Sequence, residues 1–588
     1  AEIPEKILTN NLYGIEIDER AGELAAFALT IKARAKQRRF FNKGVKPNIC
    51  VLENVHFDGN ELKEYMDFVG RDLFTAPLQT TLRQFEEADN FGSLIRPDVT
   101  DVDGMLRILE SKNVSGHLFL SMTHQKVLQA LLQADYLSPK YHVVIANPPY
   151  MGGGGMNGRL SSWANDNYQK SKSDLFSMFM VRAIELTKTN GYMGMINLPS
   201  WLFLSSFKDL RANILDKYTI DSMLHMGRGI FGIDWGSTAF VIKKAKETWK
   251  ISTFFRLHKR NFQHIYYHDI AKIFLNAKKN PEYRYDFDRY REDGEINEIG
   301  EESHNNGLKL FYRAFTSDFK KIPGSPIAYW VPNFDFFDLK KIANDWISGG
   351  RIKTHNGQKY IRFIWEISNK NNRWKRLLKG GDYRKYFGNE DFLVDWSDDA
   401  VSFYEEHGGL YSEKYREKEG ICWSKITSTV PSFRIKRSET EYDSASPTIF
   451  NSKFKCDNYI LAFLNSKVSL FLLKAINPTL NTQVADVMAL PVCQINAKDQ
   501  NSIEAKEKVL VDISFSDWNA YETSWDFTIL PLLNPDYRQP TLKATYQKLR
   551  AHWREMTLEM QRLEEENNRI FIDAYGLQDE LTSEVPLN

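Results

Sequence analysis

The chain has 588 residues, and its 77 Lys and Arg side chains are balanced by 76 Asp and Glu side chains, so any surface for a polyanion must be local. This length predicts roughly three or four domains, and a hydrophobic content of 42% predicts well-packed cores. The four cysteines are scattered singly, which excludes a disulfide framework and a cysteine-based metal site and fits a reducing cytosol. No apolar run reaches about 18 residues, which excludes a membrane span.

The first part of the chain alternates predicted strands and helices. A predicted strand at Leu12–Ile17 is followed by a helix with apolar residues on one face, and "NICVLENV" contains a second short strand. Val143–Ala146 is apolar throughout, as strands covered on both faces are. The next helix is predicted to be capped by Ser173 and to end at Gly191. This alternation predicts a parallel, doubly wound α/β sheet over residues 1–245.

The rest of the chain has a different organisation. Residues 246–325 are charged and tyrosine-rich with weak periodicity, which we interpret as a helical connector. Residues 326–495 alternate short strands and turns, which predicts an α+β domain. Residues 496–588 are predicted to form a strap and a helical hairpin.

The terminal helix carries a seam of apolar residues that recur alternately four and three residues apart. The seam consists of Leu542, Tyr546, Leu549, Trp553, Met556, Met560 and Leu563. It fits a helix packed on the chain's own domain, which we favour, or a contact with a separate subunit.

The main chemical signal is the run Asn147, Pro148, Pro149 and Tyr150 after the third predicted strand. Two adjacent prolines have fixed φ and donate no backbone N–H, so they end the strand abruptly. The Asn147 side chain and the Pro148 backbone offer two carbonyl oxygens that suit an exocyclic NH₂ group, and Tyr150 offers a face to a planar base. The alternative is an ordinary end of a strand, but the order of these residues favours an amine-methylating site.

These four residues resemble the catalytic motif of amino-methyltransferases that use S-adenosylmethionine, which is Asp, Asn or Ser followed by Pro-Pro and an aromatic residue. The resemblance implies that Glu16 binds the cofactor's ribose hydroxyls and that Ile17 lies against its adenine. It implies further cofactor contacts by Glu53 or Asn54 and by Asp174. For Glu16, a solvated turn is the alternative to cofactor binding, and it fits the sequence less well. For Glu53, Asn54 and Asp174, a purely structural role fits about as well as a cofactor contact. For Asp174 that role is a helix N-terminal acid.

Four longer stretches narrow the resemblance. "GYMGMINLPSWLFLSSFKDLRANIL" and "HMGRGIFGIDWGSTAFVI" are similar to the large adenine-specific methyltransferases of restriction and phage-defence systems. "FGSLIRP" and "WNAYETSWDF" point to the PglX family of BREX phage-defence loci, and the resemblance spans Leu12 to Phe527. It implies a doubly wound methyltransferase sheet, an α+β target-recognition domain and a C-terminal helical segment.

This resemblance also implies what the protein does. It implies methylation of the N6 amine of a flipped adenine in double-stranded DNA, with S-adenosylmethionine as cofactor and other BREX-system proteins as partners. It implies a bacterial cytoplasmic, nucleoid-associated location. The family's glycine-rich cofactor loop belongs just before the Glu16 strand, after a long N-terminal region, and this sequence contains neither. We therefore expect a C-terminal part of a longer protein that lacks much of its cofactor pocket.

Residues 326–495 are predicted to recognise DNA. Two stretches, Asn371 to Gly388 and Trp423 to Arg437, interleave cations with aromatic residues, a pattern that suits phosphate and base contacts. Each stretch alone is more often a solvated face, but their position behind a base-methylating motif favours DNA. The predicted contacts are Arg373, Lys375, Arg376, Arg384, Lys385, Lys425, Arg434, Lys436 and Arg437. If these line a cleft, a phage DNA-mimic protein would compete with DNA there.

Two other classes of protein fit parts of the sequence. The first is an enzyme that methylates a base in RNA or a glutamine amide in protein, but a strand-rich second domain argues against it. The second is a non-catalytic DNA-recognition subunit, which the missing loop supports and the intact Asn147–Tyr150 run opposes.

Overall fold

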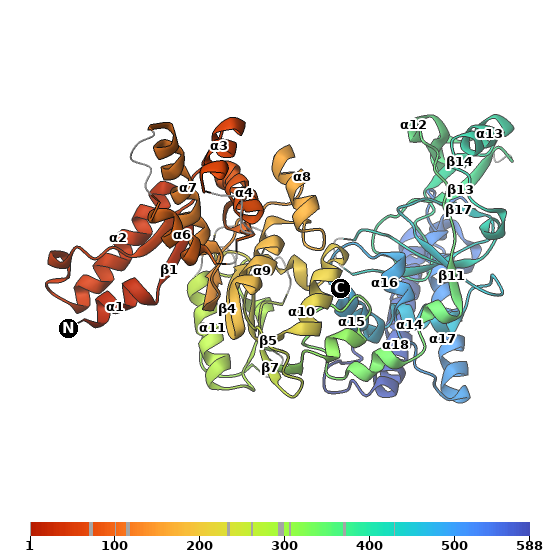
Figure 1. Ribbon diagram of the computed structural model, residues 1–588. Coiled ribbons are helices and arrows are strands. Elements are labelled where there is room, and N and C mark those ends of the chain that lie inside the picture. Colours follow the sequence, from red (N-terminus) through yellow and green to blue (C-terminus); the bar gives the residue numbers. More distant parts are fainter. Residues whose placement is uncertain are drawn as a thin grey trace. The chain divides into compact units, whose positions relative to one another are not determined.

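The computed structural model describes residues 2–69, 75–99, 101–112, 118–231, 236–259, 263–291, 299–304, 307–368, 372–427 and 430–587. The chain divides into two compact units, unit 1 (Ala1–Ser317) and unit 2 (Asp318–Asn588), each with its own hydrophobic cores (Figure 1). Parts of the stretches singled out in the sequence, at residues 232–235, 371 and 428–429, lie outside the described residues.

Unit 1 confirms the predicted α/β class, and its main strands form two sheets. In the first, β1 (Tyr13–Glu16) pairs in parallel with β2 (Asn48–Val51). The second has six strands in the order β10-β7-β5-β6-β4-β3. Its strands are β3 (Tyr141–Ala146), β4 (Thr187–Asn197), β5 (Thr219–Met226), β6 (Ser237–Lys243), β7 (Ile251–Leu257) and β10 (Phe311–Phe315).

Helices lie on both faces of the six-stranded sheet. α9 (Leu175–Leu186) packs on β3 and β4, and α10 (Lys208–Lys217) packs on β5. α11 (Tyr267–Lys279) packs on β7 from the face opposite to α9 and α10. The cap of α9 is Asp174, whose side chain accepts from Phe176 N–H, rather than the predicted Ser173. The stretch from 187 to Gly191, expected to end the helix, begins β4 instead. Unit 1 also contains α1 (Ile3–Asn10), α2 (Glu19–Lys36), α3 (Gly59–Val69), α4 (Thr75–Gln84), α5 (Ala88–Phe91), α6 (Val102–Glu110), α7 (Leu118–Leu137) and α8 (Gly158–Asn167).

The predicted single sheet is divided between β1 and β3. Among the described residues, no strand pairs with β1 opposite β2 or with β3 opposite β4. Ile145 of β3 is 81% exposed, although a central strand of a doubly wound sheet is covered on both faces. The rings of Tyr13 and Tyr141, at the starts of β1 and β3, have centroids 5.5 Å apart. Two open strand edges therefore lie near each other in unit 1.

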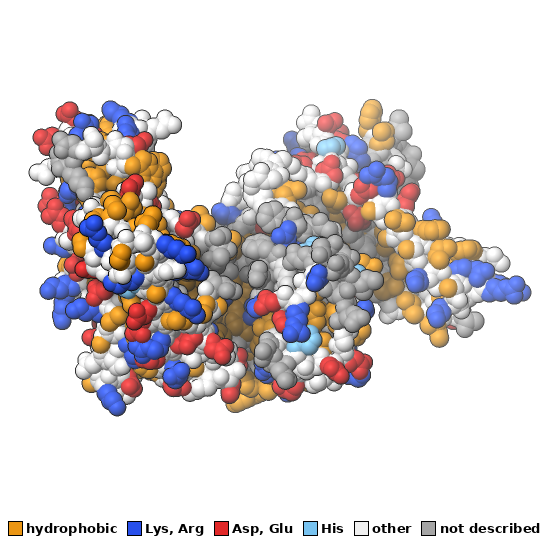
Figure 2. All heavy atoms as spheres, turned by 180° about the vertical axis from the view of Figure 1, so that it is seen from behind, with side chains coloured by type: hydrophobic (Ala, Val, Ile, Leu, Met, Phe, Trp, Pro, Cys, Tyr) orange, Lys and Arg blue, Asp and Glu red, His pale blue; other side chains and the backbone are white. Residues whose placement is uncertain are grey.

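The apolar face predicted for the helix after the first strand is uncovered. Leu24, Phe27 and Ile31 of α2 are all exposed, and hydrophobic side chains are visible on the N-terminal part of unit 1 (Figure 2, right). Together with the open edges, this face shows that the β1–β2 part of unit 1 is only partly covered by the described residues.

Most of the segment at 246–325, as far as residue 317, belongs to unit 1, and its described residues are mostly not helical. It contains one long helix, α11 (Tyr267–Lys279), and short strands β8 (Arg284–Tyr285) and β9 (Leu308–Lys309). β7 pairs in parallel with β5, and β10 pairs antiparallel with β7, so this segment extends the six-stranded sheet. The sequence did not reveal these strands because β7 buries residues on both faces and shows no clear alternation.

Unit 2 contains two four-stranded sheets, with orders β11-β18-β15-β16 and β12-β14-β13-β17. The strands are β11 (Trp346–Ser348), β12 (Ile361–Phe363), β13 (Trp374–Leu378), β14 (Phe392–Asp395), β15 (Gly420–Trp423), β16 (Phe433–Lys436), β17 (Thr440–Tyr442) and β18 (Thr448–Asn451). The helices are α12 (Gly357–Tyr360), α13 (Asp398–Glu406), α14 (Asn458–Asn465), α15 (Lys467–Ile476), α16 (Val484–Met488), α17 (Ala497–Trp518) and α18 (Leu542–Tyr575).

The apolar seam on α18 is covered in its later part and exposed in part of its first half. Leu549 and Leu563 are buried, and Leu563 and Met560 pack against Leu510 of α17, which agrees with a helix packed on its own domain. Toward the start of α18, Tyr546 and Trp553 are exposed. None of the described helices alone has the length and apolar composition of a membrane span; α14 and α15 pass that test only together, with a bend of 68°.

A buried group of ionisable side chains joins α17 and α18 to the segment before β14. Glu564 of α18 accepts from Lys385 Nζ at 2.7 Å and from the Tyr386 hydroxyl at 2.8 Å. Glu507 of α17 is 1% exposed, and its burial raises its pKa well above the ordinary 4.5; the negative charge of Glu564 adds to this and Lys385 opposes it. The folded state therefore holds a proton on Glu507 that the unfolded chain releases.

Glu507→Gln is expected to flatten the pH dependence of unit 2 stability. Between pH 4.5 and the raised folded pKa, the folded state binds more protons than the unfolded state, so wild-type stability falls by about 1.4 kcal/mol per pH unit. The Glu507→Gln variant should unfold at a higher temperature than wild type at pH 8 and at a similar temperature near pH 4. Thermal unfolding across this range tests it, with Asp512→Asn, at an exposed position of the same helix, as control. Parallel pH profiles for wild type and variant would contradict the assignment.

Candidate active site

The Asn147–Tyr150 run lies at the carboxyl end of β3, where ligands bind in open α/β sheets. The Tyr150 hydroxyl donates to Asn147 Oδ1 at 3.2 Å, so the two side chains are in contact. Asn147 is exposed and Pro148 is buried. The half-buried Tyr150 ring meets Phe176 edge-on, with centroids 6.5 Å apart, and burial raises the pKa of Tyr150. The structure thus brings the amide, the rigid imides and the ring together.

Asp174 fixes the chain that follows this run. Its Oδ1 accepts from Met151 N–H at 3.1 Å and from Phe176 N–H at 3.2 Å. Gly152 forms an isolated β-bridge with Asp174. Burial raises the pKa of Asp174, and the backbone hydrogen bonds oppose that shift. Asp174 therefore ties the loop after Tyr150 to the start of α9; its predicted contact with a cofactor stays a prediction.

Glu16 and Ile17 lie at the end of β1, as predicted. Glu16 Oε1 accepts from the backbone N–H groups of Ile17 and Asp18, at 2.8 and 3.2 Å, which fixes the carboxylate at the strand tip. Ile17 is exposed, and a Cβ placed on Gly92 would lie 3.1 Å from Ile17 Cγ2. Gly92 has φ +55°, a conformation that favours glycine, so this close approach explains a glycine here. A carboxylate fixed beside an exposed apolar residue fits the ribose and adenine of a nucleoside.

Glu53 and Asn54 follow β2, and both side chains bind other parts of unit 1. Glu53 Oε2 accepts from Gln129 Nε2 of α7 at 2.8 Å. Asn54 Oδ1 accepts from Asp89 N–H of α5 at 3.0 Å. These contacts position the end of β2 against α5 and α7. They leave the predicted cofactor contact of either residue as a prediction.

The stretch "FGSLIRP" has a structural role that sequence reasoning missed. Arg96 makes a bidentate contact with Glu185 of α9, at 2.7 and 2.8 Å, and its guanidinium lies 4.0 Å from the centroid of the Tyr168 ring. Phe91 stacks on Trp163 of α8, with centroids 4.4 Å apart. This stretch therefore connects α8 and α9 beside Ile17. Arg96 and Glu185 are 89 residues apart in the sequence, so their pairing could not be predicted from neighbouring residues. The glycine was the only residue of the stretch that could have indicated a structural role.

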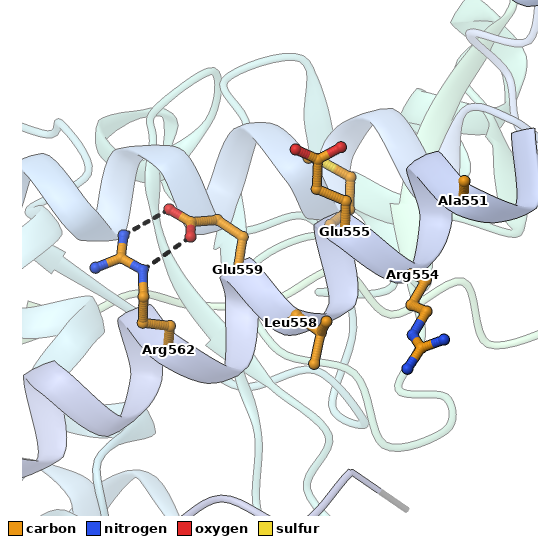
Figure 3. A pocket seen from close by; sticks show the side chains of 7 residues that line it. Ala551, Arg554, Glu555, Leu558, Glu559 and Arg562 are labelled. Atoms are coloured by element: carbon orange, nitrogen blue, oxygen red, sulfur yellow. Dashed lines mark hydrogen bonds and ion pairs between the residues drawn. The ribbon is translucent and has the colours of Figure 1, made fainter. Parts of the chain in front are cut away.

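Two surface hollows differ in their relation to this site. A hollow of about 420 Å³ on the six-stranded sheet, on the face that α11 partly covers, is lined by Asn147 together with Gly194, Leu224 and Val241. A larger one, about 680 Å³, is lined by a single helix, α18, whose Arg554, Glu555, Leu558, Glu559 and Arg562 side chains are shown in Figure 3. Glu559 and Arg562 pair there at 2.7 Å. Only the sheet hollow contains a residue of the candidate site.

Two of the predicted DNA contacts in unit 2 are interior residues. Arg434 and Lys436 of β16 are both 0% exposed. Arg434 donates to the Arg384 carbonyl oxygen and to Ser424 Oγ, and Lys436 Nζ donates to the Lys418 carbonyl oxygen at 2.7 Å. Burial lowers the pKa of Lys436 to about 8. The expectation that these two side chains form a DNA-facing surface is corrected: they pack inside the domain.

Arg376 and Arg437 belong to an ion-pair network that includes Glu390 and Asp526. Glu390 is 3% exposed and pairs with Arg437 Nη2, and Arg376 Nη1 lies 3.9 Å from its Oε2. Asp526 pairs with both arginines, at 2.5 Å with Arg376 and at 3.0 Å with Arg437. Asp526 lies in the "WNAYETSWDF" stretch, so ion pairs hold this stretch against the sheets of unit 2.

The remaining predicted cations divide by exposure. Arg384 pairs with Asp517 and lies over Trp518, and Lys385 is part of the buried group with Glu564. Lys375 has 25% of its side chain exposed and lies 3.2 Å from Glu417 and 3.7 Å from the buried Glu441. Two cations are more open to solvent: Arg373 pairs with Asp395 but has 57% of its side chain exposed, and Lys425 is partly exposed with no ion pair among the described residues.

Comparison with known proteins shows similarity to methylases of restriction-modification systems and to adenine-specific methyltransferases. Residues 10–231 match the Eco57I restriction-modification methylase family. The chain is 32% identical over 569 residues to the adenine-specific methyltransferase BrxX of Escherichia coli O9:H4 (strain HS), covering 90% of this chain and 44% of that protein. It is 30% identical over 621 residues to the adenine-specific methyltransferase PglX of Lacticaseibacillus casei (strain Zhang), covering 99% of this chain and 49% of that protein.

The chain is therefore homologous to the PglX and BrxX adenine-specific methyltransferases over most of its length, and it spans about half the length of these curated relatives. The predicted resemblance is confirmed. Among solved structures, the type IIL enzyme MmeI in complex with DNA gives a TM-score of 0.43 at 11% identity, covering 90% of this chain and 77% of that one. The type ISP enzyme LlaGI, bound to a DNA substrate mimic, gives the same score and identity, covering 90% and 47%.

Proposed function

We propose that this chain is the base-methylating and target-recognising part of a site-specific DNA methyltransferase that modifies the N6 amine of adenine in a BREX-type defence system. The observation that carries the proposal is the contact between Asn147 and Tyr150 at the carboxyl end of β3. Homology to adenine-specific methyltransferases supports the choice of adenine.

In this proposal, Asn147, Pro148 and Tyr150 each have a separate task. Asn147 Oδ1 has two lone pairs, of which the Tyr150 hydroxyl uses one, so the other can accept a hydrogen of the adenine amine. The Pro148 carbonyl oxygen accepts the second hydrogen, and the Tyr150 ring stacks on the flipped base. Two accepted hydrogens raise electron density on the amine nitrogen. Glu16 and Ile17 would hold the nucleoside part of S-adenosylmethionine, which supplies the methyl group.

Within the same proposal, duplex DNA is the main partner of unit 2. Arg373 and Lys425 are the two predicted cations that keep exposed charge without deep burial, so we retain them as phosphate contacts. The protein would act on nucleoid DNA in the bacterial cytoplasm together with other BREX-system proteins. A phage DNA mimic would compete with DNA for that surface.

The direct test is to sequence modified bases in DNA from cells that carry the full-length gene. N6-methyladenine at one sequence motif, absent from cells without the gene, is the expected result. Unmodified adenine despite production of the protein would favour the alternative function, a non-catalytic DNA-recognition subunit. The division of the sheet between β1 and β3 supports that alternative for the 588-residue chain by itself.

The isolated 588-residue chain is expected to bind S-adenosylmethionine weakly or not at all. The open edge between β1 and β3 leaves Glu16 and Asn147 without a connecting strand among the described residues, so one wall of the predicted pocket is missing. Calorimetry on the chain measures this, with the full-length protein as the positive control. A low-micromolar dissociation constant for the isolated chain would contradict the prediction.

A further inference from the structure

Unit 2 carries a stack of aromatic rings on the edge of its second sheet, near the labels α12 and β14 in Figure 1. β12 is the edge strand, and its Phe363 is in register with Phe392 of β14. The Phe363 and Trp365 rings are stacked, with centroids 4.6 Å apart and an angle of 10°. The Phe363 and Phe392 centroids are 4.7 Å apart, and Lys379 Nζ lies 5.4 Å from the Phe392 centroid. We call Lys379, Phe392, Phe363 and Trp365 the aromatic ladder.

Exposure increases outward along the aromatic ladder. Leu377 and Val394 of the same sheet are completely buried, whereas Phe363 is 39% and Trp365 is 56% exposed. Rings that serve only to fill a core are covered, so the outermost ring of the ladder has a face that the core does not use.

One exposed cation at the inner end of the aromatic ladder suits an anionic ligand. Lys379 is exposed at the inner end, and no carboxylate of the described residues lies within ion-pair distance of it. Two carboxylates lie near the ladder and keep their negative charge: Glu366 accepts from the Phe363 N–H at 2.7 Å, and Asp443 accepts from the Ala445 N–H at 2.7 Å and is attracted to Lys379. A protein partner would need only the apolar rings, whereas a nucleic acid uses a planar ring and a neighbouring cation together.

We propose that the aromatic ladder is a DNA-stacking platform, on which Trp365 stacks against a nucleobase while Lys379, at the other end of the ladder, contacts a phosphate farther along the DNA. The proposal rests on the proposed function, because an enzyme that flips an adenine leaves bases that have lost a stacking neighbour. An aromatic side chain that takes such a place strengthens binding by about 5- to 150-fold per base. Trp365 would thus recognise distorted DNA through unit 2 itself.

The test is DNA binding by the 588-residue chain, measured by fluorescence anisotropy with a labelled duplex that contains a single unpaired adenine. Trp365→Ala should weaken binding about 5- to 150-fold, the factor that corresponds to one lost stacking contact. The dependence of affinity on salt should stay as in wild type. Trp365→Phe keeps a planar ring and should retain most of the affinity. Lys379→Ala should reduce the slope of log affinity against log salt by about 0.9, as expected for one lost phosphate contact.

Trp249→Ala is the matched control, because Trp249 lies in unit 1 and is 90% exposed. Equal affinities for Trp365→Ala and Trp249→Ala would overturn the proposal. If Trp365→Ala also lowers the unfolding temperature, its weaker binding could come from lost stability, and the Lys379→Ala variant then decides. A slope of log affinity against log salt that is the same for Lys379→Ala as for wild type overturns the proposal. Absence of duplex binding by the wild-type chain would instead count against the proposed DNA-binding function of unit 2.

Discussion

Asn147→Ala in the full-length protein is expected to lower adenine methylation by at least about 100-fold while leaving DNA affinity nearly unchanged. The substitution removes an acceptor that interacts most strongly with the amine as positive charge develops on it, and loss of one such preorganised group costs about 100- to 1,000-fold in rate. Asn147 is exposed and its side chain contacts the Tyr150 hydroxyl, so the fold should tolerate alanine. Methyl transfer to duplex DNA and binding to the same duplex are measured side by side.

Two variants of Tyr150 serve as controls for this result. Tyr150→Phe removes only the hydroxyl that donates to Asn147 Oδ1 and should reduce the rate modestly. Tyr150→Ala removes the stacking face and should cost about 5- to 150-fold. Undiminished adenine methylation by the Asn147→Ala variant would refute the assignment of Asn147, whatever the two Tyr150 variants do.

Glu390→Ala is expected to destabilise unit 2 by about 3–5 kcal/mol. Glu390 is the buried carboxylate beside the guanidinium groups of Arg376 and Arg437, and its removal leaves these two largely buried charges with only the more exposed Asp526 and Glu439 as partners. The Thr440 hydroxyl, at 3.4 Å from Glu390 Oε1, would lose a partner as well. Urea unfolding followed by a spectroscopic signal from unit 2 measures the change.

Glu439→Ala provides the comparison within the same network. Glu439 contacts the same two arginines, at 3.0 and 3.2 Å, but has 51% of its side chain exposed. Exposed pairs contribute about 0–1 kcal/mol, so this variant should unfold almost as wild type does. Similar losses for Glu390→Ala and Glu439→Ala would show that burial does not decide the strength of this network.

The parts of the fold that local sequence determines could be predicted. The Asn147–Tyr150 run, its strand and Glu16 at the tip of β1 all depend on residues that are neighbours in the chain. The α/β alternation of unit 1 was readable for the same reason. Asp174 shows the limit, because Ser173 and Asp174 are both good helix caps and only the three-dimensional contact with Met151 N–H distinguishes them.

The environment of the cations in unit 2 could not be predicted from sequence. Arg437 meets Glu390 across 47 residues of sequence, and Arg376 meets Asp526 across 150. A stretch that interleaves cations and aromatic residues has the same sequence pattern whether its cations contact phosphate groups or carboxylates that are distant in the sequence. Arg434 and Lys436 follow the alternation of an exposed strand, yet both faces of β16 are covered in the structure.

If unit 2 recognises the DNA target, as proposed, the ion pairs of Asp526 limit which residues can be exchanged between related enzymes to change that target. A graft that replaces residues 326–495 alone would separate Arg376 and Arg437 from the acid that pairs with them. The strap from Trp518 to Asp526 also supports Arg384 through the Trp518 ring. Under the proposed function, a chimera with a new specificity would have to carry the strap along with the sheets, because Asp526 lies outside residues 326–495 but pairs with two arginines inside them.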